Sequence, residues 1–188
     1  MLNKIILIFV FIGLPCLAWG ENTPLAISLW HPLELPDQEY NVTGLRFDLI
    51  YGAHRNVHGM DIGIINRTMG DQIGFQYGSI NIVDEDFRGW QEGGINITKG
   101  NFYGWQDGFG NEVDKDFIGL QTGIMNGVQE DLRGVQIALF NYVGEESYGL
   151  QLGIINTAGE LDGVQIGLLN FNNSNSPIGF FPLVNAKW

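Results

Sequence analysis

The chain has 188 residues, of which 21 are acidic and nine are basic, and its net charge is −12. A surface this acidic repels phosphate backbones, which excludes nucleic acid as an expected partner. The only cysteine is Cys16, so the sequence beyond it can form neither a disulfide nor a thiolate–metal site. The length is sufficient for one domain with a core of its own.

Residues 1–20 have the pattern of a secretory signal peptide. Lys4 precedes a short apolar run, and Ala18 and Gly20 supply the small residues of a cleavage site, so we expect the mature chain to begin at Glu21. A membrane anchor is the alternative, but the run is shorter than the roughly 20 residues that span a bilayer. A lipidated Cys16 is a third possibility, to which Pro15 directly before it is a poor fit.

The rest of the chain divides into an entry segment and a repeat array. Residues 21–43 include LAISLWHPLELP, which we expect to form an entry or capping strand broken by prolines. Residues 44–188 form an array with a period of about 15 residues, and its last unit, from Pro177 to Trp188, is expected to be a shortened cap. The units open at Gly44, Gly59, Gly74, Gly89, Gly104, Gly119, Gly134, Gly149, Gly163 and Gly179.

Each unit is numbered here from its glycine as position 1. Positions 2 and 7 are apolar in nearly every unit, and short acidic turns separate the units. Position 3 is glutamine in seven units, and position 8 is asparagine in eight. The glutamines are Gln76, Gln91, Gln106, Gln121, Gln136, Gln151 and Gln165, and the asparagines are Asn66, Asn81, Asn96, Asn111, Asn126, Asn141, Asn156 and Asn170. Aromatic and β-branched residues bounded by Gly, Asp and Asn predict short strands.

Two all-β architectures fit this period. We favour a β-solenoid of about ten 15-residue coils, because the nearly constant unit length and the recurrent amides suit stacked coils joined by hydrogen-bonded side-chain ladders. The alternative is an antiparallel β-barrel or meander with one strand per unit. A membrane barrel would turn Glu92 and Asp107 toward lipid together with Trp90 and Trp105, where a charge is costly.

A cluster of aromatic and acidic residues in the middle units is the one candidate binding surface. An aromatic stripe with carboxylates suits a carbohydrate or a protein partner, although aromatic packing between coils explains the same residues. The residues are Trp90, Glu92, Phe102, Tyr103, Trp105, Asp107 and Phe109. His54, His58 and Asp61 have the one metal-like spacing, but they lie in a predicted turn, and we expect no metal, cofactor or catalytic residue.

The layout resembles a family of bacterial surface-repeat proteins of unknown function. The resemblance lies in the tandem GxQxGxxN units, in ISLWHPLELP followed by GLRFDLIYG, and in the ending FFPLVNAKW. It implies a location in the bacterial envelope or at the cell surface and no catalytic activity. This chain departs from the family pattern at Arg46, Asp61, Ala138 and Gly110, which we interpret as local variation within the array.

The expected function is therefore that of a secreted bacterial envelope or cell-surface repeat protein. Its role would be structural or adhesive, with a protein or carbohydrate at the cell surface as the partner and with association with the outer membrane possible. The alternative function is a small outer-membrane barrel that acts as a pore or an anchor. No arrangement of acid, base and nucleophile suggests an enzyme.

Overall fold

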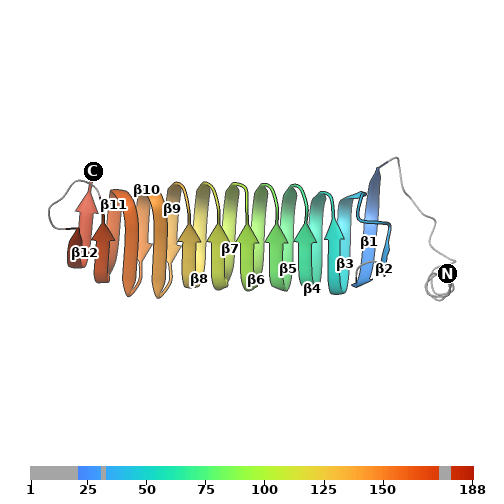
Figure 1. Ribbon diagram of the computed structural model, residues 1–188, viewed down its shortest axis with the longest axis horizontal. Helices are drawn as coiled ribbons and strands as arrows, with labels where there is room; N and C mark the ends of the chain where they lie inside the picture. Colours follow the sequence, from blue (N-terminus) through green and yellow to red (C-terminus); the bar gives the residue numbers. More distant parts are fainter. Residues whose placement is uncertain (1–20, 31–32, 174–178) are drawn as a thin grey trace.

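A computed structural model describes residues 21–30, 33–173 and 179–188, and the predicted signal peptide lies outside these residues. The chain winds into a rod of about ten stacked coils (Figure 1). Successive units pair in parallel and in register, for example Gly104 with Gly119 and Asn111 with Asn126. The predicted β-solenoid is confirmed, and the antiparallel barrel or meander is wrong because neighbouring repeats run in the same direction.

Twelve strands make up the described part of the chain, and they form one continuous sheet in the order β12-β11-β10-β9-β8-β7-β6-β5-β4-β3-β1-β2. The strands are β1 (Asn22–Trp30), β2 (Leu33–Leu35), β3 (Asn41–His54), β4 (Val57–Thr68), β5 (Gln72–Val83), β6 (Phe87–Thr98), β7 (Phe102–Val113), β8 (Phe117–Val128), β9 (Leu132–Ile137), β10 (Phe140–Leu152), β11 (Ile155–Asn172) and β12 (Phe180–Lys187). In the described residues no helix is long and apolar enough to cross a membrane.

Each coil has two walls and two edges. The first wall runs from position 14 of one unit to position 4 of the next, and the second wall covers positions 7 to 10. The acidic turns at positions 11 to 13 join the walls at one edge, and a bend at positions 5 and 6 joins them at the other. Side chains at positions 14, 3, 8 and 10 point inward, as in Phe117, Gln121, Asn126 and Val128 of β8. Four inward side chains per coil fill the narrow space between the walls.

The opening glycine is required by how closely the coils approach one another. Gly119 has a φ of 141°, a backbone conformation that L-residues other than glycine rarely adopt. A Cβ at this position would lie 1.9 Å from the carbonyl oxygen of Gly104 in the preceding coil. Any side chain here would force the coils apart, which explains why glycine recurs every 15 residues.

The position 3 glutamines form a ladder that runs along the interior. Each Nε2 donates to the Oε1 of the glutamine in the preceding coil, as in Gln106 to Gln91 at 2.8 Å and Gln91 to Gln76 at 2.7 Å. Some of these Nε2 atoms also reach the opposite wall, where Gln136 donates to the carbonyl oxygen of Tyr142. We call this column the glutamine ladder; it links neighbouring coils and, at several rungs, the two walls.

The position 8 asparagines form a second ladder with the opposite polarity. Each Nδ2 donates to the Oδ1 of the asparagine in the following coil, as in Asn81 to Asn96 and Asn96 to Asn111, both at 2.8 Å. The same amide also donates to a position 4 carbonyl across the bend, as in Asn81 to Glu92 at 2.9 Å. This asparagine ladder therefore holds the bend closed while it joins the coils.

Apolar side chains occupy the two remaining interior columns. At position 14 the rings of Phe87, Phe102 and Phe117 stack, with centroids 4.7 and 5.1 Å apart. Facing them at position 10 are Val113 and Val128, both fully buried. These columns form the core of the middle and carboxy-terminal coils, where burial of apolar surface contributes about 25 cal/mol per Å².

The two ends of the rod differ from its middle. At the amino-terminal end β1 stacks in parallel on β3, so the entry segment supplies a first layer, and β2 folds back antiparallel on β1. At the carboxy-terminal end β12 pairs antiparallel with β11. The unit predicted to open at Gly179 is therefore not a further parallel coil, because the chain reverses direction and covers the exposed end of the sheet.

Deletion of one whole unit tests the modular construction. Removing residues 119–133 joins Ile118 to Gly134, two positions that follow one another in every coil. Because each coil contacts only its neighbours, we expect a moderate fall in stability with the cooperative β-sheet transition retained. The control deletion of residues 119–125 joins positions that do not follow one another in any coil. Side chains that point inward would then no longer match those of the neighbouring coils, and the deletion should abolish folding. Equal loss of structure in both deletions, measured by circular dichroism and thermal melting, would contradict this assignment.

The asparagine ladder is tested in the middle of the rod. Asn126 Nδ2 lies 3.2 Å from Asn141 Oδ1, and Asn126 Oδ1 accepts from Asn111 at 2.9 Å. Asn126→Leu leaves both neighbours without this partner in a buried position, and we expect a loss of about 1–3 kcal/mol in the free energy of unfolding. Alanine at Asn126 and Asn141 together should be non-additive, since the two share a hydrogen bond. The exposed control Glu145→Ala should change stability by no more than about 0.5 kcal/mol.

Candidate functional site

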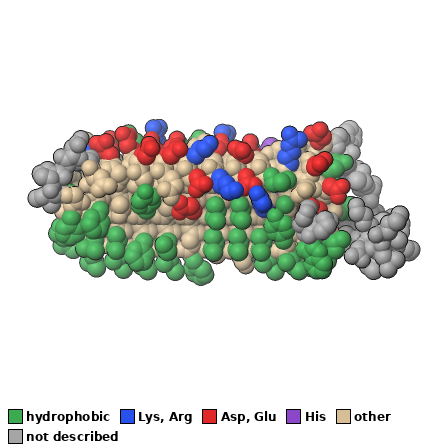
Figure 2. Space-filling model, in the orientation of Figure 1, with side chains coloured by type: hydrophobic (Ala, Val, Ile, Leu, Met, Phe, Trp, Pro, Cys, Tyr) green, Lys and Arg blue, Asp and Glu red, His purple; other side chains and the backbone are tan. Residues whose placement is uncertain are grey.

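Because the amides occupy the interior, many of the large apolar side chains are displaced to the outside. They gather along the bend at positions 2, 4, 6 and 7, on both walls that flank it, and form the lower edge of the rod (Figure 2). We call this surface the apolar edge. Its exposed members are Leu45, Phe47, Leu49, Ile50, Met60, Ile64, Tyr77, Trp90, Ile95, Trp105, Phe109, Ile124, Met125, Ile137, Leu139, Phe140, Ile154, Ile166, Leu168 and Leu169.

Charged side chains gather on the opposite edge, where the turns at positions 11 to 13 join the walls (Figure 2). This acidic edge contains Asp71, Asp84, Glu85, Asp86, Asp114, Asp116, Glu130, Asp131, Glu145, Glu146 and Glu160. Some of its carboxylates have a structural role, since Asp71 Oδ1 accepts from the backbone nitrogen of Asp86 at 3.2 Å and Asp131 Oδ1 accepts from that of Glu146 at 3.1 Å. The rod is thus amphipathic across its width, with most of its acidic residues on the edge opposite the apolar edge (Figure 2).

The structure brings part of the predicted binding surface together on the first wall. Trp90 and Trp105 stack with their ring centroids 5.0 Å apart and their planes at 2°. Glu92 and Asp107 are paired in neighbouring coils beside them, and Trp105 Nε1 donates to Thr122 Oγ1 at 3.1 Å. These residues form one continuous outward strip.

The other three predicted residues lie in different surroundings. Tyr103 is half-buried on the outside, with the guanidinium of Arg88 5.1 Å above its ring. Phe109 is 71% exposed at the bend. Phe102 is fully buried between Phe87 and Phe117, so it belongs to the core and is not part of a surface. The physical reason is strand alternation, which places Phe102 on the inward side with Gln106.

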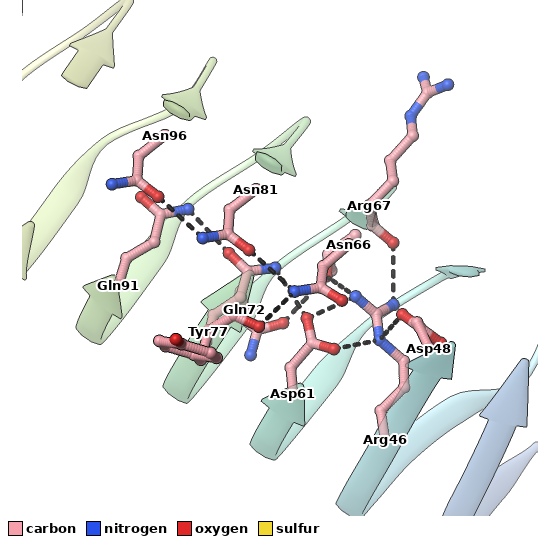
Figure 3. A network of polar contacts seen from close by, with 12 residues as sticks. Arg46, Asp48, Asp61, Asn66, Arg67, Gln72, Tyr77, Asn81, Gln91 and Asn96 are labelled. Carbon is pink, nitrogen blue, oxygen red and sulfur yellow. Dashed lines mark hydrogen bonds and ion pairs between the residues drawn. The ribbon is translucent and has the colours of Figure 1, made fainter. Parts of the chain in front are cut away.

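The departures at Arg46 and Asp61 are not local variation, because both residues terminate the glutamine ladder. The ladder donates toward the amino terminus, so its last Nε2, on Gln76, needs an acceptor, and Asp61 Oδ2 accepts it at 2.8 Å. Arg46 in the next coil then donates to both carboxylate oxygens of Asp61 at 2.6 and 2.5 Å (Figure 3). At the other end Asn185 of β12 donates to Gln165 Oε1 at 2.8 Å.

A second carboxylate, Asp48, completes this buried network. Its Oδ2 lies 3.1 Å from Arg46 Nε, on the far side of the guanidinium from Asp61 (Figure 3). A Cβ at Gly52, which is aligned with Asn66 of the ladder, would lie 1.9 Å from Asp48 Oδ1. The Asp48 carboxylate therefore fills the space that an asparagine side chain takes in later coils.

Burial shifts the pKa values of two groups near Arg46 in opposite directions. Loss of solvent raises the pKa of Asp48 to about 7, since Arg46 is engaged with Asp61 and offsets only part of this cost. Loss of solvent, reinforced by the positive charge of Arg46, lowers the pKa of His54 to about 4. His54 and Asp61 are inside the rod and His58 is exposed, so these three side chains do not converge on one point despite their metal-like spacing.

Comparison with known protein families, with curated proteins and with solved structures finds no match for this chain. The protein is therefore described by its own architecture, a repeat protein of stacked coils of about 15 residues with glutamine and asparagine ladders.

The opposed pKa shifts predict an opposed pH dependence of stability. Asp48 has a raised pKa in the folded state, so its contribution falls as the pH rises from about 4 to about 7. His54 has a lowered pKa, so its contribution is lost as the pH falls from about 6.5 to about 4. The two slopes largely cancel in the wild-type protein.

Two variants separate these slopes. In His54→Gln only the aspartate term remains, and stability relative to wild type should fall as the pH rises from about 4 to about 6.5, by up to about 1.4 kcal/mol per pH unit. In Asp48→Asn only the histidine term remains, and relative stability should rise over the same interval. Urea unfolding at each pH gives both slopes. Parallel profiles for the two variants would show that neither group titrates with a shifted pKa.

Proposed function

We propose that the chain is a secreted bacterial envelope or cell-surface repeat protein with a structural or interaction role and no catalytic activity. The observation that carries the proposal is the apolar edge, which follows the bend along the length of the rod (Figure 2). The largest apolar patch on a typical monomer is about 300–600 Å² and is often functional. An edge that extends over two walls and about ten coils exceeds this range, which supports a role in binding.

The chemistry of the interior supports a structural role for the recurrent polar residues. Glutamine and asparagine are the side chains that repeat most regularly, and both sets are used in the two ladders, as in Gln121 to Gln106 and Asn141 to Asn156, both at 2.8 Å. What varies from coil to coil is the outside, at positions 4, 6 and 7. A regular scaffold with a variable outer surface is the arrangement that repeat proteins use for binding.

The tryptophan strip favours some partners over others. Phe75 lies edge-on to one side of Trp90 at 5.0 Å, and Trp105 covers the other face of that ring at the same distance. Rings stacked along the rod present their edges to solvent and not their faces. A sugar packs against a free aromatic face, so this geometry supports a protein or lipid partner more than a carbohydrate.

Two features of the sequence support an extracellular location. Lys4, the apolar run and the small residues at 18 and 20 have the pattern of a signal peptide. The GxQxGxxN units and the two ends resemble bacterial surface-repeat proteins, and the ladders give the recurrent Gln and Asn a common structural reason. The alternative of a pore required a barrel, and it is not retained.

Export is tested directly with the full chain. Expressed in a Gram-negative bacterium, it should be processed after Gly20 so that the purified protein begins at Glu21. It should also be accessible to protease or antibody on intact cells, with a cytoplasmic protein as the control. A protein that begins at Met1 and is found in the cytoplasm would overturn the proposal. One that begins at a lipid-modified Cys16 would overturn cleavage after Gly20 and show that a lipid anchors the chain.

A further inference from the structure

We propose that the apolar edge docks onto the surface of a lipid bilayer, with the rod lying flat in the interface and its acidic edge in water. This inference rests on the proposed interaction role and names the partner of that surface. Figure 2 shows the segregation that it requires, with hydrophobic side chains along one edge and charges along the other. Amphipathic helices with such a division lie in the interface plane and bury their apolar side about 5–10 Å, and the rod presents the same division on a larger scale.

The shape of the edge favours a fluid partner over a second copy of the chain. Exposed apolar residues flank the bend on both walls, as with Phe47 at position 4 and Met125 at position 7. One wall of about ten coils is roughly 48 Å long, and positions 2 to 4 span about 10 Å, so a flat partner covers roughly 500 Å². A standard protein interface buries about 800 Å² on each side. Lipid can cover both walls at once, which a flat protein surface cannot.

Backbone hydrogen bonding permits this insertion. The two walls pair with neighbouring coils, as in the register of β4, β5 and β6, and the asparagine ladder ties the position 4 carbonyls next to the bend, for example Tyr77 O to Asn66 Nδ2 at 2.8 Å. Unpaired backbone groups are what keeps open strands out of lipid. Here the two walls that flank the bend have their backbone groups paired along the rod.

The tryptophans lie at the depth that this orientation predicts. Trp90 and Trp105 are at position 2, about 7 Å further from the bend than position 4. With the bend in the acyl region, both indoles lie at the level of the headgroups, where tryptophan is enriched in membrane proteins.

Two carboxylates set the affinity. Glu92 and Asp107 lie at position 4 of the same two coils as the tryptophans, on the same wall. A charge that approaches the acyl region is costly, so the edge binds weakly and reversibly. Replacing both, as Glu92→Gln with Asp107→Asn, should raise the affinity for vesicles about tenfold.

A site-specific probe tests the orientation in the full chain. In a Cys16→Ser background, an environment-sensitive fluorophore is placed at Leu168→Cys on the apolar edge or at Lys115→Cys on the acidic edge. With vesicles of zwitterionic phosphatidylcholine, the Leu168 probe should shift to the blue and be quenched by a spin label on the lipid chains. The Lys115 probe should remain in water. Residues 1–20 are the same in both labelled proteins, so a difference between the two probes reports the orientation of the rod.

Matched charge changes test the energetics. Ile64→Asp with Leu168→Asp should weaken vesicle binding at least tenfold, whereas Lys115→Asp, which changes the net charge equally, should not. Circular dichroism checks that each variant is folded, and both apolar positions are exposed, so the core is unaffected.

Three results would overturn the proposal. One is equal lipid quenching at Leu168 and Lys115, which would mean that the edge has no preferred orientation. Another is a blue shift at Leu168 that grows with protein concentration without vesicles, which would assign the edge to a second copy of the chain. The third is no shift at all. Each is distinct from failure of export, which is measured in cells and would leave the vesicle result standing.

Discussion

The structure depends on one constraint, the need of a buried primary amide for hydrogen-bond partners on both its nitrogen and its oxygen. Most coils contribute one glutamine and one asparagine to the buried interior, and neighbouring coils supply their partners. An amide one residue out of register would leave two neighbours unsatisfied, at about 1–3 kcal/mol for each group. The ladders therefore explain why insertions are rare, and why the unit that departs from glycine at Ala138 still keeps Gln136 and Asn141 in line.

The direction of the glutamine ladder explains the otherwise irregular ends of the rod. A chain of amides has a free donor at one end and a free acceptor at the other, and both need a terminating group of a different type. Asp61 accepts the last glutamine donor, and a buried carboxylate in turn requires the charge of Arg46. Asn185 donates to the last glutamine oxygen from a strand that runs in the reverse direction. Charged residues thus enter the interior at the place where the repeat stops.

Filling the interior with amides has a consequence for the surface. A narrow coil has four inward positions, and two of them are amides, so the apolar residues at positions 2, 4, 6 and 7 have no interior to occupy. Stacking along the rod covers part of each side chain, as for Trp90 and Trp105, which remain 40% exposed. The repeat therefore produces an apolar edge in every coil without any dedicated binding motif, and the lipid proposal follows from this arrangement.

The sequence alone determined the period and favoured a solenoid with amide ladders over a barrel, because identical residues 15 apart can satisfy one another when coils stack in parallel. It also contained the alternation that groups Phe102 with Gln106 and sets Tyr103, Trp105 and Asp107 on the opposite side. Alternation shows which residues share a side, but it does not show which side is inward, and a rule that places the most apolar side inside would choose Trp105 over Gln106. Only the tertiary structure decided this, since the ladder partners of the amides lie in neighbouring stacked coils and the tryptophans can lie outside without an unpaired group. The roles of Arg46, Asp48 and Asp61 could likewise be recognised only in the folded chain. The groups that terminate a ladder are identified by their contacts at its last rung, and these contacts join different coils.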